Sequence, residues 1–157
     1  AQFDLLMDIR DRTSEINDKV LTIRSIKKQV NTLTGLMKDS GFKKDEIKDA
    51  GKALTKSLTE IEESLIQVKS KSGQDPLNYP IKLDNKIASL VWVVSGVDAR
   101  PTAQSYGVLD DLVSQSQVHY KKLDKVLTDD LFKFNNMVSD AGVPAVMIVP
   151  SEMSVER

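Results

Sequence analysis

Residues 8–39 read DIRDRTSEINDKVLTIRSIKKQVNTLTGLMKD, and this stretch decides the fold. Its apolar residues recur at intervals of seven, at Ile9, Ile16, Ile23, Val30 and Met37. A neighbouring stripe consists of Leu6, Val20, Ile26 and Leu33. Seven residues make about two turns of an α-helix, so the spacing predicts one long amphipathic helix over about residues 2–39. Gly41 follows as a C-terminal breaker, after which the chain reverses direction.

A second apolar series predicts a helix over about residues 45–71. Its members are Ile47, Leu54, Ile61 and Val68, with Leu58 and Leu65 on the adjoining row. Gly51 lies within this helix and marks either a close approach between helices or a weak point. Because only a few residues connect the first two helices, we expect them to pack antiparallel as a hairpin.

Residues 72–80 are expected to link two hairpins, because Pro76 and Pro80 forbid a continuous helix there. A third helix is predicted over about residues 81–97, where Leu83, Ile87, Leu90 and Val94 share one face. The β-branched residues of this segment would also suit a strand. Helix is favoured because the chain offers no second strand candidate long enough to pair with it.

Apolar residues at intervals of seven also predict a fourth helix, over about residues 102–141, that begins at Pro101 or Thr102. They are Tyr106, Val113, Tyr120, Leu127 and Phe134. Asp130 falls on a neighbouring apolar row with Leu109, Leu123 and Met137, where a buried acid would need a partner. The apolar residues 146–149 are expected to form an extended strap on the bundle. The chain is therefore predicted to be a single all-α domain over 1–157, an antiparallel four-helix bundle of two helical hairpins with an extended C-terminal tail.

Composition supports this class and excludes several functions. The 157 residues include 29% charged and only 5% aromatic side chains, a balance typical of helical bundles. The 22 basic and 23 acidic residues nearly cancel and are mixed along the chain, which argues against nucleic acid as a partner. The longest apolar stretch, residues 90–94, is too short to span a membrane. Because the sequence begins at Ala1 in helix-like residues, we expect an excised C-terminal domain of a larger protein.

The sequence predicts no catalytic residue, no cofactor-binding residue and no metal site. His119 is the only histidine and Cys is absent, so nucleophile–histidine triads and multi-histidine metal sites are excluded. His119 is expected at a helix surface or boundary. Adjacent acids at Glu62-Glu63, Asp110-Asp111 and Asp129-Asp130 point about 100° apart on a helix. Solvated helix faces are the expected explanation for these pairs, and a capping or interhelical hydrogen bond is expected for Asp130.

Four residues are candidates for an interface. Trp92 lies about 100° around the third helix from the side that carries Val91 and Val94, where it could be an exposed anchor for a partner. Asp75, Asp98 and Arg100 lie in the predicted turns.

Residues 75–88, DPLNYPIKLDNKIA, and residues 100–106, RPTAQSY, are similar to the C-terminal region of bacterial sortilin-like, BNR-repeat proteins that are often labelled glycosyl hydrolases. Phe134-Asn135 and residues 142–145 fit the same region, and the resemblance covers roughly residues 1–150. It implies an accessory domain that follows β-propellers in an exported protein, periplasmic or secreted. The propellers are expected elsewhere in the parent, because the Ser-x-Asp-x-Gly-x-x-Trp signature of BNR repeats does not occur in this chain.

Three hypotheses follow. The leading one is a non-catalytic accessory module that packs against the β-propeller domains of its parent chain or mediates assembly. In the second, Asp75, Asp98 or Arg100 completes a hydrolase active site at the propeller interface. In the third, the domain forms a homo-oligomer through the surface around Trp92.

Overall fold

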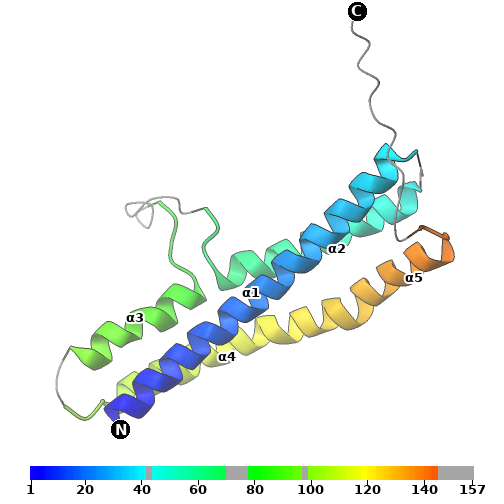
Figure 1. The fold of residues 1–157 in the computed structure, drawn as a ribbon. Helices are drawn as coiled ribbons and strands as arrows, with labels where there is room; N and C mark the ends of the chain where they lie inside the picture. The colour runs from blue at the N-terminus through cyan, green and yellow to red at the C-terminus, as the bar shows by residue number, and fades with distance from the viewer. Residues whose placement is uncertain (42–43, 70–77, 97–98, 145–157) are drawn as a thin grey trace, which may run out of the picture.

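The computed structural model of the chain describes residues 1–41, 44–69, 78–96 and 99–144 (Figure 1). Its helices are α1 (Gln2–Asp39), α2 (Asp45–Leu65), α3 (Leu83–Ser95), α4 (Ala103–Lys125), the π-helix η2 (Val126–Leu131) and α5 (Phe132–Asp140). The last three are continuous, so the described chain folds as four long helical segments without a strand. The predicted all-α, four-helix bundle is confirmed.

Helix α1 has the bounds that its heptad pattern predicts. The residues at intervals of seven from Ile9 to Met37 are all buried, because a face repeated every two turns stays on one side of the helix. The helix ends at the cap residue Ser40, and Gly41 follows with a φ of +76°, a conformation that residues with a Cβ rarely adopt. The predicted reversal of the chain is thus made by a glycine that the turn requires.

The two hairpins combine in a way that the sequence does not predict. In Figure 1, α2 and α3 follow one another along the bundle, so that α2 packs against one half of α1 and α3 against the other. The long segment formed by α4, η2 and α5 contacts both α2 and α3. Each half of the bundle is therefore three helices thick, and the two longest helical segments bridge the halves.

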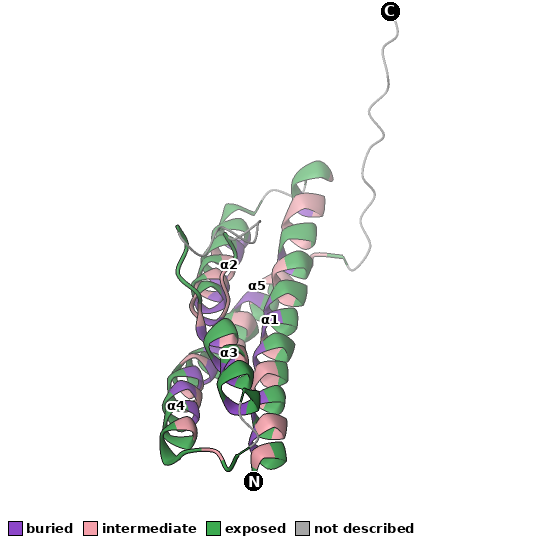
Figure 2. Cartoon of the chain, turned by 90° about the vertical axis from the view of Figure 1, so that its left-hand side faces the viewer, coloured by how far each residue is buried: buried purple, intermediate pink, exposed green. Residues whose placement is uncertain are grey.

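One hydrophobic core runs through both halves. Figure 2 shows the buried residues on the inward sides of the helices. The largest fully buried side chains are Ile9, Ile16, Ile23, Leu58, Leu65, Ile87, Leu109 and Leu123. Burying one such side chain stabilises a fold by about 1.5–3 kcal/mol. Each of the five α-helices contributes at least one buried residue to this core.

Gly51 marks a close approach between helices. A Cβ built on it would lie 3.2 Å from side-chain atoms of both Val30 and Thr34 and 3.3 Å from the ring of Phe134. These distances are shorter than ordinary van der Waals contact. The glycine therefore lets α1 and α5 approach α2 at this point.

The predicted ends of two helices were wrong. Helix α2 stops at Leu65, not residue 71, because Ile66 has extended backbone angles of φ −129° and ψ 155°. The Gln67 side chain donates a 2.8 Å hydrogen bond to the carbonyl of Pro80, which joins the two ends of the connection to α3. Helix α3 begins at Leu83, two residues later than predicted. Residues 72–77 of the predicted linker and the predicted strap at 146–149 lie outside the described residues.

The fourth segment is interrupted by a turn of π-helix. A π-helix places i→i+5 hydrogen bonds where an α-helix places i→i+4, and so accommodates one extra residue in a turn. Across η2 the inward position passes from Asp130, which is exposed, to Leu131, which packs against the core. The prediction that Asp130 lies on an inward row was wrong, because that row assumed an uninterrupted α-helix. The acid needs no buried partner.

Candidate functional site

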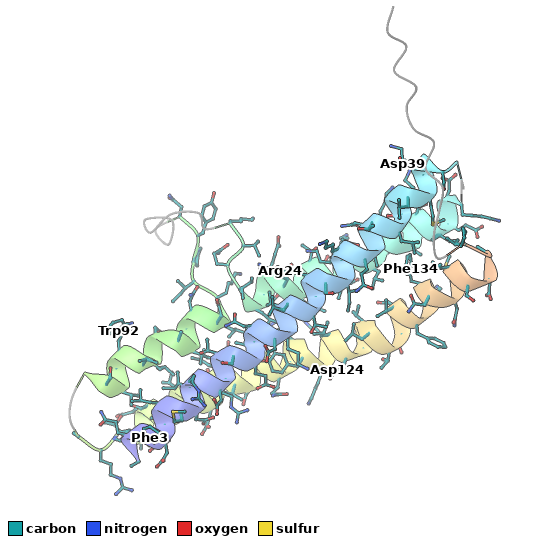
Figure 3. The ribbon with its side chains drawn as sticks, viewed as in Figure 1. Phe3, Arg24, Asp39, Trp92, Asp124 and Phe134 are labelled. Carbon is teal, nitrogen blue, oxygen red and sulfur yellow. The ribbon has the colours of Figure 1, made fainter. Side chains whose placement is uncertain are left out.

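The outward side of α3 carries the most exposed large hydrophobic residue of the described chain. The side chain of Trp92 is 81% exposed and that of Val93 65% exposed, with Val91 beside them at 36%. Figure 3 shows Trp92 projecting from the outer side of the helix. The opposite side is buried and consists of Leu83, Ile87, Leu90 and Val94. The exposed side of α3 therefore combines these three apolar residues with the exposed polar residues Asn85, Lys86 and Ser89.

The backbone that carries Trp92 is held in place. The side chain of Gln2, at the start of α1, donates a 2.7 Å hydrogen bond to the carbonyl of Val94. This carbonyl lies in the last turn of α3, where the helix supplies no intrahelical partner. The Gly96 amide donates to the Trp92 carbonyl at 3.1 Å and caps the same turn. Trp92 thus stands on a fixed helix end, which lowers the entropy that an interface loses on binding.

Of the other three predicted interface residues, the structure describes Arg100. Asp75 and Asp98 lie outside the described residues. Arg100 is exposed and lies two residues before Thr102, which caps α4 by accepting a 3.3 Å hydrogen bond from the Ser105 amide. The structure therefore describes Trp92 and Arg100 and brings neither into a catalytic arrangement.

Glu62 corrects the prediction that the adjacent acids lie on solvated helix faces. Its carboxylate is buried between α1 and α2, where it accepts hydrogen bonds from Arg24 Nε at 2.6 Å and Lys27 Nζ at 2.9 Å. Burial raises the pKa of Glu62, but the two hydrogen bonds and the positive charges outweigh it and hold the pKa below its ordinary value. Glu63, Asp110, Asp111 and Asp129 are exposed, as predicted, and Asp130 is exposed although an inward position was predicted for it. The buried carboxylate thus joins α1 and α2.

A surface groove of about 400 Å³ lies between α2 and α4. Its rim is formed by Ser57, Glu60 and Ser64 of α2 and by His119, Lys122 and Lys125 of α4, and Ile61 and Val126 also line it. Burial and the charge of Lys122 lower the pKa of His119. Sequence reasoning treated His119 alone and missed this group. The detectable pattern was three basic residues spaced three apart, which puts them along one side of a helix.

Asp84, in the first turn of α3, is a second polar group that the sequence did not indicate. Its Oδ1 atom is buried without a hydrogen-bond partner. Burial raises the pKa of this carboxyl, against two backbone hydrogen bonds that lower it. In the described part of the chain, no three His, Cys, Asp or Glu side chains lie close enough together to hold a metal ion. Among the described residues, Asp84 is thus a half-buried acid outside any such group.

Comparison with known proteins does not assign the chain. No family model matches it, and no similarity was found to a curated protein or to a solved structure. The family resemblance of residues 75–106 thus remains a prediction from the sequence. Among the described residues, no helix combines the length and hydropathy that crossing a bilayer requires. The two surface features that point to a function are the exposed side of α3 and the groove between α2 and α4.

Proposed function

We propose that this chain is a non-catalytic helical module that binds a protein partner through the outward side of α3. The observation that carries the proposal is the 81% exposure of Trp92 on a helix whose other side is fully packed. Tryptophan is among the residues most enriched at binding hot spots, because it contributes a large apolar area at a small loss of rotamer freedom. Because the Trp92 side chain is exposed to water on a helix that is held in place, we infer that it serves binding more than folding.

The partner we propose is a β-propeller domain of the same parent protein, which would be exported to the periplasm or secreted. The similarity of residues 75–88 and 100–106 to sortilin-like, BNR-repeat proteins supports this partner, because the first segment includes the start of α3 and the second follows its end in the chain. The absence of histidine and cysteine clusters supports a module that adds binding and no chemistry.

The test begins with the reading frame upstream of Ala1. If it encodes propeller repeats, those repeats and this chain are produced separately and their affinity is measured by calorimetry. Trp92→Gln is expected to weaken binding at least about tenfold, since removing a hot-spot aromatic changes the free energy of binding by about 2 kcal/mol or more. Phe132→Gln is the matched control, because this aromatic is 63% exposed on another helix. Equal losses from both variants would contradict the proposal, as would turnover of glycosides or peptides by this chain alone.

Self-association through the same side of α3 is the second candidate, because the exposure of Trp92 and Val93 would serve a second copy equally well. Equilibrium sedimentation decides between the two. A dimer of the wild type that becomes a monomer in Trp92→Gln identifies self-association. A wild-type monomer at concentrations at which the propeller binds excludes it.

A further inference from the structure

The groove between α2 and α4 has more positive than negative charge on its rim. Two lysines, Lys122 and Lys125, and one acid, Glu60, line the groove, so the lining residues carry a net charge of +1 when His119 is neutral (two lysines minus one glutamate). Neither lysine forms an ion pair with a carboxylate of the described residues, whereas Lys27 is paired with Glu62. The two ammonium groups are therefore available to an anion.

The inner wall of the same groove is apolar. Ile61 is buried on α2 and the half-buried Val126 is the first residue of η2. The Ser57 hydroxyl, on the rim, makes no hydrogen bond to a described residue, whereas that of Ser64 donates to the Glu60 carbonyl at 2.8 Å. A volume of about 400 Å³ lies within the range of small-molecule sites. Apolar walls with a few polar groups on one side are typical of such sites.

We propose that this groove binds a small amphiphilic anion, with its oxyanion group against Lys122, Lys125 and Ser57 and its apolar body against Ile61 and Val126. The two lysines favour a negatively charged ligand, and the apolar wall favours a ligand that also has an apolar part. The site is formed by α2, α4 and the start of η2, so it does not use α3. The proposal is therefore independent of partner binding through Trp92.

His119 supplies a direct readout. As the only histidine it gives a single set of imidazole resonances in NMR spectra. Its pKa is lowered by burial and by the charge of Lys122, and the other charged residues of the groove are Glu60 on α2 and Lys125 on α4. An oxyanion bound beside Lys122 favours the charged imidazolium and raises the pKa of His119.

The experiment titrates the His119 resonances with benzenesulfonate, whose charge stays constant across the pH range of histidine. Sulfate tests the charged group alone, and benzyl alcohol tests the apolar body alone. We expect a saturable shift and a raised His119 pKa with benzenesulfonate, and binding about tenfold weaker with sulfate, since burying about 60 Å² of ring is worth about 1.5 kcal/mol. Benzyl alcohol should leave the pKa unchanged. No saturable shift with benzenesulfonate, or equal binding of sulfate, would overturn the proposal.

Charge variants on one helix complete the test. Lys122→Gln should raise the pKa of His119 in the free protein and weaken benzenesulfonate binding about tenfold, since a charge-assisted hydrogen bond is worth about 1.5–3 kcal/mol. Lys121→Gln is the matched control, because Lys121 is exposed on α4 but does not line the groove. It should bind benzenesulfonate like the wild type. An equal loss in both variants would indicate diffuse attraction to the whole helix and would reject the site.

Discussion

Helices α2 and α3 occupy successive halves of the same bundle, yet they face water differently. Each packs an apolar stripe against α1. None of the 21 residues of α2 is an exposed large hydrophobic residue, whereas α3 has three in 13 residues, namely Val91, Trp92 and Val93. The difference is not a matter of the core, which both helices share. The outer side of α3 thus exposes more apolar surface than that of α2, and the proposed partner binding rests on this contrast.

The two helices are also attached to α1 by different means. Glu62 of α2 is buried and accepts hydrogen bonds from Arg24 and Lys27 of α1. Such a network fixes how the two helices align, because a shift of one helix along the other would leave a buried charge without a partner. Helix α3 has no ion pair to α1 among the described residues. Its polar link is the hydrogen bond from Gln2 to the Val94 carbonyl. Electrostatic specificity is thus concentrated in the half that contains α2.

The largest expected effect tests whether the two halves unfold together. Leu58→Ala in α2 and Ile87→Ala in α3 each remove a side chain that is 0% exposed, and each should lower the free energy of unfolding by about 2–5 kcal/mol. Because α1 and the α4–α5 segment run through both halves, urea denaturation followed by circular dichroism should show one transition in both variants. A separate early transition in Ile87→Ala alone would show that α3 unfolds independently.

The next effect concerns the ion pairs of α2. Glu62→Gln should lower the free energy of unfolding by about 1–3 kcal/mol at pH 7, because Arg24 and Lys27 lose a buried charged acceptor. The folded-state pKa of Glu62 lies below 4.5, so this stabilisation is present above about pH 4.5 and is lost as the pH falls through the folded-state value. Urea denaturation at several pH values measures it. Glu63→Gln is the exposed control and should stay within about 0.5 kcal/mol. A deficit that persists unchanged in strong acid would contradict the assignment.

A smaller effect is expected where the chain enters α4. The Thr102 hydroxyl accepts a hydrogen bond from the Ser105 amide at 3.3 Å, so Thr102→Ala should lower stability by about 1 kcal/mol. Ser114→Ala, on an exposed turn of the same helix, is the control and should have little effect. Thermal denaturation of both variants checks the prediction. Similar losses in the two would mean that the cap is not formed in solution.

The smallest change in stability should come from the most exposed residue. Trp92→Gln is expected to alter the free energy of unfolding by less than about 0.5 kcal/mol, because the ring buries little area in the folded chain. Urea denaturation followed by circular dichroism makes this measurement without a tryptophan signal. A loss of several kcal/mol would show that the ring supports the fold, and the contrast between α2 and α3 would then no longer indicate a binding surface.

Much of this architecture follows from periodicity. The bounds of α1 could be predicted because its heptads, its turn glycine and its length all agree. The end of α2 could not, because Val68 continues the apolar series in the sequence although the backbone has already left the helix at Ile66. The burial of Glu62 also escaped prediction. Its partners lie 38 and 35 residues away in the sequence, and only the packed hairpin brings them together.

The candidate sites divide in the same way. The exposure of Trp92 follows from its position around the helix, which the sequence gives directly. The groove between α2 and α4 combines residues from both hairpins, so its shape depends on how the hairpins dock. Local patterns contain no information on that docking. The spacing of residues 119, 122 and 125 places three basic residues along one side of α4. No pattern in the sequence predicts that Ser57 and Ser64 lie opposite them.

The π-helix η2 determines which side of α5 faces the core, because it holds one more residue in its turn than an α-helix would. A residue added to a helix rotates everything after it by about 100° unless a wide turn accommodates the addition. Here the wide turn lets Leu131 take the inward place that a regular helix would give to Asp130, and Phe134 remains buried three residues later. The side of α5 that packs against α2 therefore depends on the extra residue in η2, whereas the buried residues of α4, which precede η2, do not.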